Sequence, residues 1–470
     1  MILLISLIIL LFAHHVYRTI NGSFKIFTIT NMFILSYVVF VYIGILCIQF
    51  GFLDEEEAQQ FIINKEITLR MWVYTTLGFF FLLLGILVAY THYPKVKTIQ
   101  AKVVSKGISY TAFDISKKNR TYIYLLLGLS IFVLLLYRRN LGGLPLESVL
   151  LGLSKSDLSL LRSDATNNFS GSLYRYDMFM HTLPMLLLLF AGIIRKYGNK
   201  KWNVLFYILL AYNVFFSLTT LQKGPIVRLI LLLVSLSIYQ GRKISLKYVI
   251  AIGGIGVAVI LLMYIFFMGM GEYPVSAIIQ TATHRIFIST IAPLFWYIKY
   301  TDIHGFLWGA TFPNPGGLLP FTNIPLTVEV QDLAVGNGDI VGSMPTVFIG
   351  EAYANFGVIG ICVVSFFFGF FIQSLDNAFL SKLNSKKSVG LSVLFLYFLN
   401  YFSRYAESSF SSLFTDVKFY FPIFIYLIYK YISSNKRVIN NENNMSRNQC
   451  SHIYGRENFP EGMSVTGKEV

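Results

Sequence analysis

The chain has 470 residues, of which 55% are hydrophobic and only 13% are charged, and its formal net charge is +15. Soluble globular domains carry about 25% charged residues, so this composition excludes an ordinary soluble protein. A charge of +15 would suggest nucleic acid in a soluble protein. In a membrane protein it reflects the Lys and Arg that collect in cytoplasmic loops, and we expect no nucleic-acid partner.

Continuous apolar runs of about 20 residues predict membrane-spanning helices, because the hydrocarbon core of a bilayer is about 30 Å thick. The runs do not alternate between apolar and polar residues, as the strands of a membrane barrel would. The predicted fold class is therefore all-α, a polytopic integral membrane helical bundle of about 11–12 spans. The spans delimited from the sequence are 2–17, 27–50, 69–90, 121–137, 178–194, 202–220, 226–239, 248–268, 346–371, 389–402 and 419–432.

The distribution of Lys and Arg predicts the sidedness of the chain. Most of the 38 basic residues fall in short loops and the tail, which we place in the cytoplasm. Two long polar loops, 138–177 and 269–345, then lie outside, with the N-terminus outside and the C-terminus inside. This arrangement requires the apolar stretch 276–300 to be re-entrant or interfacial. Residues 1–432 form one transmembrane domain, and the polar residues 433–470 are predicted to be a disordered cytoplasmic tail.

Several arginines lie outside the membrane, where the excess of cytoplasmic basic residues does not explain them. A guanidinium can hold a phosphate group through two hydrogen bonds, and helix N-termini also favour anions. Snorkelling is the alternative for arginines at span ends, and we prefer it for Arg138 and Arg139; for Arg404 the alternative is an i,i+3 ion pair with Glu407. The predicted diphosphate-binding residues are Arg162, Lys223, Arg228, Arg285 and Arg404.

The outer loops also hold aromatic residues, carboxylates and histidines, a mixture typical of sugar-binding surfaces but also of membrane interfaces. The predicted sugar-binding residues are Tyr174, Tyr176, Trp296 and Trp308. The candidates for a catalytic acid or base are Asp302, His304, Asp339 and Glu351, and no spacing selects one of them. Pro, Gly and Asn predict irregular structure over 309–345. No cysteine or histidine spacing is typical of a metal site, so no metal is expected.

Three segments carry a family resemblance. Residues 342–360, which read GSMPTVFIGEAYANFGVIG, enter a span from the second loop. Together with the turn TLQKGP at 220–225 and the Arg404 segment, they resemble the O-antigen polymerases (Wzy type), or oligosaccharide repeat unit polymerases. The likeness covers most of the chain in organisation, through the span count, the two large periplasmic loops and the closing pair of spans.

The resemblance implies a glycosyltransferase of the bacterial inner membrane. Its substrates would be undecaprenyl-diphosphate-linked oligosaccharide repeat units, joined at the periplasmic face into O-antigen or a related surface polysaccharide. The donor's glycosyl–diphosphate bond would supply the energy, so no cofactor, ATP or nucleotide sugar is expected. Membrane lipids and a polysaccharide chain-length regulator are the implied partners. Lys223 would match the basic residue of the family's inter-span turn, and Arg162, Arg285 and Arg404 its loop and span-end arginines.

The chain departs in two places from the sequence patterns of these related families. The related O-antigen ligases carry a His before the equivalent span entry, where this chain has Ser343, Met344, Pro345 and Thr346, which favours a polymerase. The arginine-to-glycine spacing of some polymerases is absent after both Arg162 and Arg285. A lipid-linked oligosaccharide flippase is the alternative from another class, although short loops and internal repeats would be expected of a transporter.

Overall fold

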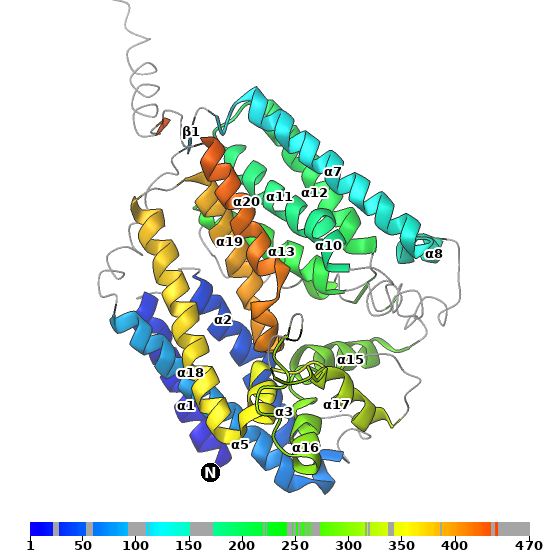
Figure 1. Cartoon of the computed structure of the whole chain (residues 1–470), viewed down its shortest axis with the longest axis vertical. Helices are drawn as coiled ribbons and strands as arrows, with labels where there is room; N and C mark the ends of the chain where they lie inside the picture. The colour runs from blue at the N-terminus through cyan, green and yellow to red at the C-terminus, as the bar shows by residue number, and fades with distance from the viewer. Residues whose placement is uncertain are drawn as a thin grey trace, which may run out of the picture.

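The computed structural model describes residues 1–21, 28–52, 60–92, 110–111, 113–150, 173–219, 221, 223–241, 273–314, 317, 320–336, 343–385, 388–433 and 438–439, with scattered positions between 247 and 265 (Figure 1). The long helices are α1 (Ile2–Asn21), α5 (Lys65–Thr91), α7 (Lys117–Leu141), α12 (Lys200–Thr219), α13 (Lys223–Tyr239), α18 (Phe348–Ser385), α19 (Val389–Ser403) and α20 (Val417–Ser433). The shorter helices are α2 (Ile29–Tyr37), α3 (Ile43–Gln49), α8 (Pro145–Leu150), α10 (Leu173–Asp177), α11 (Leu183–Ile194), α15 (Val275–Phe287), α16 (Leu294–His304) and α17 (Leu326–Val335). The π-turns η1 (Val38–Tyr42) and η2 (Met178–Thr182) and the 3-10 turns η4 (Tyr405–Glu407) and η5 (Ser411–Phe414) complete the helical elements.

The predicted fold class is confirmed: the chain is an all-α, polytopic membrane protein. Eight described helices are long and apolar enough to cross a membrane. In this count α2, η1 and α3 form one continuous helix, and α10, η2 and α11 form another. Two shorter apolar helices, Gly224–Tyr239 and Val389–Ser403, match two further predicted spans. The remaining prediction, the span 248–268, falls mostly outside the described residues.

Figure 1 shows that the helices end at two opposite edges of the molecule. One edge carries the start of α1 together with α16, α17 and α8, and we call it the α16 end. The other edge carries the start of α7, the end of α20 and a short antiparallel pairing of β1 (Tyr110–Thr111) with β2 (Val438–Ile439), and we call it the β1 end. The rest of the predicted tail, like residues 151–172 of the first predicted loop, lies outside the described residues.

Helix α18 extends well past residue 371, where the predicted span ended. The additional turns contain buried polar side chains whose partners lie on other helices. The Asp376 carboxylate accepts the backbone N–H groups of Ile29 (3.3 Å) and Thr30 (3.5 Å), which the first turn of α2 leaves without helical partners. The Asn377 amide donates to the Ala89 carbonyl of α5 (3.2 Å). Asp376 and Asn377, which lie beyond the span predicted by composition, thus find their partners on other helices of the bundle.

Helices α5 and α18 approach each other closely because each places a glycine against the other's backbone. A Cβ at Gly85 would overlap the carbonyl oxygen of Phe366, and a Cβ at Gly369 would overlap that of Leu82. Helix association in membranes relies on such small residues, since hydrocarbon supplies no hydrophobic drive between helices. The backbones of α5 and α18 are therefore in close contact at this crossing.

We expect Gly85→Val to destabilise the protein by about 1–3 kcal/mol, because the added side chain has to push α18 away from α5. The measurement is the free energy of unfolding in mixed micelles. Gly128→Val is the matched control, since a Cβ at Gly128 on α7 meets no atom within 4 Å. Equal stability of the two variants would show that the close approach of α5 and α18 contributes nothing.

The apolar stretch 276–300 is interrupted. Helix α15 has 13 residues and α16 has 11, and a turn over 288–293 separates them. Pro293 forbids continuation of α15, and the Ser289 hydroxyl donates back to the Arg285 carbonyl (3.0 Å). Neither helix is long enough to span a bilayer.

The prediction of irregular structure over 309–345 was wrong for part of that segment. Helix α17 (Leu326–Val335) forms there because its ten residues contain neither Gly nor Pro. Gly336 ends the helix in the left-handed conformation (φ 68°), as is typical of a C-terminal cap.

Candidate functional site

The broken segment between α15 and α16 lines a cavity of about 630 Å³ at the α16 end, which we call the Arg285 cavity. Its walls come from the end of α15, the 288–293 turn, the start of α16, residues 60–61 and residues 343–345. His284, Arg285, Ser289, Thr290 and Trp296 contribute polar or aromatic surface. Ligand sites in proteins commonly occupy about 300–1,000 Å³, so this cavity has room for a small ligand or part of a large one.

Hydrogen bonds hold the walls of this cavity together. The Thr346 hydroxyl donates to the Thr290 carbonyl (3.2 Å), and the Tyr297 hydroxyl donates to the Met344 carbonyl (3.1 Å). Burial raises the pKa of Tyr297, so its hydroxyl remains a donor at neutral pH. The segment that enters α18 is thereby fixed against the break between α15 and α16. Gly44 on α3 brings a third helix close, because a Cβ there would overlap the Phe287 carbonyl oxygen.

Arg285 is the cation of the cavity. Its side chain is exposed, and it forms no ion pair with any residue that the structure describes. The Trp296 ring lies on the same cavity and has the Lys299 ammonium 4.8 Å from its centroid. Arg285 and Trp296, predicted separately to bind diphosphate and sugar, are therefore brought to one place, and His284 lies beside them.

Asp302 lies in a different environment. The Arg70 guanidinium donates to both of its carboxylate oxygens (2.7 and 2.8 Å) and also to the Tyr353 hydroxyl (2.6 Å). This network ties α5, α16 and α18 together. Both carboxylate oxygens of Asp302 are engaged by the guanidinium, which favours a structural role for this residue.

We expect Asp302→Asn to cost less than about 1 kcal/mol of stability, since the ion pair is partly exposed. The measurement is the free energy of unfolding in mixed micelles, with Asp332→Asn, at an exposed position on α17, as the control. A loss of about 3–5 kcal/mol, typical of breaking a buried ion pair, would contradict this expectation.

Glu351 is buried, and both of its oxygens are occupied. They accept hydrogen bonds from the Thr311 hydroxyl (2.7 Å) and the Ser411 backbone N–H (2.9 Å). Asn355, one turn later on α18, donates to the same Thr311 hydroxyl (2.8 Å). Glu351 therefore joins α18 to the loop after α16 and to η5, and this placement favours a structural role.

The other predicted acid, base and sugar residues are dispersed. The exposed His304 ring stacks on Tyr300 with centroids 4.2 Å apart. Trp308 is 74% exposed and has a positive φ of 50°, outside the cavity wall. Tyr174 is exposed, whereas the Tyr176 hydroxyl accepts a hydrogen bond from Asn140 (2.6 Å). Asp339 lies outside the described residues.

The other predicted phosphate-binding cations lie on other elements. Arg228, in α13, donates from Nε to the Gly224 carbonyl (3.2 Å). Arg404 is exposed at the residue after α19, which ends at Ser403, so the predicted i,i+3 relation to Glu407 does not lie on one regular α-helix. Lys223 opens α13, and Arg162 lies outside the described residues.

Arg138, for which snorkelling was the preferred prediction, forms an ion pair. Its Nε donates to Glu147 of α8 (2.6 Å), and the guanidinium holds the pKa of that carboxyl below its usual range. Arg139, beside it, is exposed at the end of α7.

Sequence reasoning missed a partly buried charge cluster formed by Asp177, His181 and Lys418, which we call the Asp177 cluster. The Lys418 ammonium lies 2.8 Å from one Asp177 oxygen, and His181 Nδ1 lies 3.3 Å from the other. The buried His181 ring stacks on Phe216, and its Nε2 has no hydrogen-bond partner in the described part of the chain. The sequence signal for this cluster was the presence of charged residues on helices apolar enough to cross a membrane, because burying a charge in the hydrocarbon costs free energy.

Comparison with known proteins supplies no relative for this chain: no family model, no curated protein and no solved structure matches it. The class that the fold defines, a multi-pass all-α membrane protein, therefore rests on the helices themselves.

Proposed function

We propose that the protein is an inner-membrane glycosyltransferase that polymerises undecaprenyl-diphosphate-linked oligosaccharide repeat units into O-antigen or a related surface polysaccharide at the periplasmic face. The observation that carries the proposal is the cavity between α15 and α16, which joins a guanidinium that has no ion-pair partner among the described residues, a histidine and an indole ring. The guanidinium can bind a diphosphate, the histidine can accept a proton, and the indole ring can stack on the face of a sugar.

The transfer itself needs few protein groups. An acceptor hydroxyl oxygen attacks the anomeric carbon of the donor sugar, the bond from that carbon to the diphosphate oxygen breaks, and its electron pair leaves with the diphosphate. In this proposal Arg285 stabilises the charge that develops on the leaving diphosphate. His284 accepts the proton of the acceptor hydroxyl, because an imidazole is partly neutral near pH 7. The Trp296 ring holds a sugar by stacking.

Two lipid carriers take part in each transfer, and different arginines hold their diphosphates. Arg285 holds the donor. Arg228 lies on α13 and Arg404 follows α19, and both of these helices pack against α11, which continues from the η2 turn that holds His181. We assign these two arginines to the acceptor diphosphate.

The test is a glycan gel of the parent strain, a strain with the gene deleted and a complemented strain. Collapse of the ladder to core plus one repeat unit, restored on complementation, is the expected result. Loss of every polysaccharide band would instead indicate a flippase or a ligase. An unchanged ladder would remove the protein from this assembly pathway.

One observation favours the flippase alternative. The Asp177, His181 and Lys418 side chains place ionisable groups within the helices Leu173–Ile194 and Ser411–Ser433, and transport pathways are commonly lined by such groups. A transport assay with fluorescent lipid-linked oligosaccharide in proteoliposomes separates the two functions, because a polymerase leaves the lipid on its original side.

A further inference from the structure

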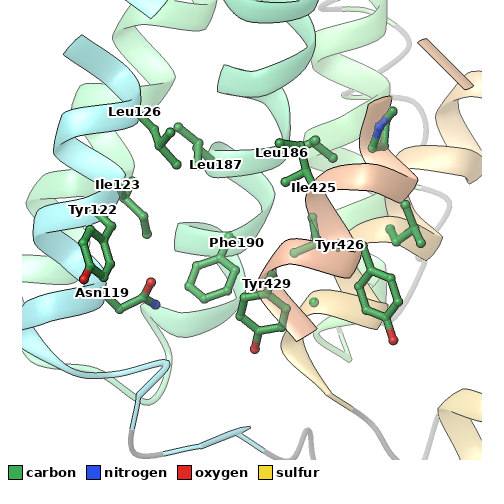
Figure 2. Close-up of a pocket in the computed structure, with 14 residues that line it drawn as sticks. Asn119, Tyr122, Ile123, Leu126, Leu186, Leu187, Phe190, Ile425, Tyr426 and Tyr429 are labelled. Carbon is green, nitrogen blue, oxygen red and sulfur yellow. The ribbon is translucent and has the colours of Figure 1, made fainter. Parts of the chain in front are cut away.

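A second cavity, of about 120 Å³, lies at the other end of the bundle, between α7 and α20 (Figure 2). Its floor comes from α11 and α19, through residues such as Leu187, Phe190 and Val393. Leu126 on α7 and Ile425 on α20 lie on facing walls. We call this cavity the α7–α20 groove.

The α7–α20 groove belongs to the surface that meets the hydrocarbon. Its lining is almost entirely apolar, and the helices beside it turn large apolar side chains away from the protein. Leu125 on α7 is 64% exposed and Phe424 on α20 is 59% exposed. An apolar cavity open between two such faces is accessible to the chains of membrane lipids.

Polar side chains close the α7–α20 groove at the β1 end. The Asn119 amide donates to the Asp114 carbonyl (3.0 Å), and the Tyr429 hydroxyl donates to the Asp114 carboxylate (2.6 Å). The groove therefore runs from an apolar interior to a hydrogen-bonded end close to the first turn of α7.

Positive charge surrounds that end. Lys117 and Lys118 are exposed in the first turn of α7, and Lys430 is exposed in the last turn of α20. The Lys118 ammonium lies 5.8 Å from the centre of the Tyr122 ring, which lines the groove. The N-terminus of α7 adds the positive end of a helix dipole, so an anion is favoured here by both helix and side chains.

We propose that the α7–α20 groove binds part of one acyl chain of an anionic phospholipid, with the lipid phosphate at Lys117, Lys118 and Lys430. The chemistry of the rim selects this occupant: apolar walls fit a hydrocarbon chain, and the three cations fit an anionic headgroup. The cations lie at the β1 end, whereas the Arg285 cavity lies at the α16 end. The bound lipid therefore belongs to the opposite leaflet from a carrier whose diphosphate reacts at Arg285.

The test is native mass spectrometry of the full-length protein titrated with phosphatidylglycerol and, separately, with phosphatidylcholine. We expect one tightly bound phosphatidylglycerol and weaker binding of phosphatidylcholine. Leu126→Trp fills the groove and is expected to weaken binding at least about tenfold, the equivalent of roughly two buried methylene groups. Leu125→Trp, on the lipid-facing side of the same helix, is the control and should bind as the wild type does.

Charge reversal tests the headgroup. Lys118→Glu and Lys430→Glu are each expected to reduce the preference for phosphatidylglycerol roughly fivefold, whereas Lys201→Glu on α12 should not change it. Unfolding temperatures within error of the wild type establish that each variant is folded. Equal affinity for the two phospholipids, tight binding by Leu126→Trp, or a co-purified polyprenyl phosphate in place of a phospholipid would each overturn the proposal.

Discussion

Arg285→Ala is expected to reduce polymer formation by at least about 10²-fold, the usual effect of removing a group that stabilises charge in a transition state. Arg285 has no ion-pair partner among the described residues, so its removal leaves no described carboxylate without a partner and should not unfold the protein. The measurement is the initial rate of glycan extension in proteoliposomes that contain lipid-diphosphate-linked repeat units, at matched protein levels.

Two further variants are compared with Arg285→Ala. Arg285→Lys keeps the charge but cannot form the two parallel hydrogen bonds of a guanidinium, so an intermediate rate is expected. Arg139→Ala removes an exposed arginine at the end of α7 and should leave the rate unchanged. If Ala at Arg285, Arg404 and Arg162 together left polymer length and amount as in the parent, the assignment of these cations to a diphosphate would be refuted.

The helices were predictable because hydrocarbon imposes their length and composition. Apolar runs located α5, α7 and α12 to within a few residues, since each is flanked by polar residues that end the run. The end of α18 was not predictable in this way, because the partners of Asp376 and Asn377 lie on α2 and α5. Local composition cannot distinguish a polar residue that ends a span from one that another helix satisfies.

The candidate site shows the same division. Arg285 and Trp296 could be singled out from their residue types and loop position, and they lie 11 residues apart and share one cavity. No sequence pattern pairs Arg70 with Asp302, which are 232 residues apart in the chain, and the pairing changes the expected role of that carboxylate. Side-chain chemistry is readable from sequence, but its partners depend on packing between distant helices.

Lys418→Met is expected to destabilise the protein by roughly 2–4 kcal/mol, because it leaves Asp177 as an uncompensated charge inside the bundle. Lys418 is one-third exposed and Asp177 is 16% exposed, so the effect should fall below that of a fully buried pair. Lys418 is held in place by its neighbours: its N–H donates to Asp416 (2.8 Å), and its carbonyl accepts from Tyr397 (3.0 Å). The measurement is the free energy of unfolding in mixed micelles.

The double variant Asp177→Asn/Lys418→Met separates the cost of an unpaired charge from any functional use of the pair. With both charges gone, no ion remains to be desolvated, and we expect most of the lost stability to return. A double variant no more stable than Lys418→Met would show that the ion pair is not the source of the loss. On the polymerase proposal the stable double variant also regains its rate of glycan extension, because neither Asp177 nor Lys418 is assigned a contact with either diphosphate. A stable double variant without activity would instead mean that the reaction or transport step uses these buried charges, as the flippase alternative requires.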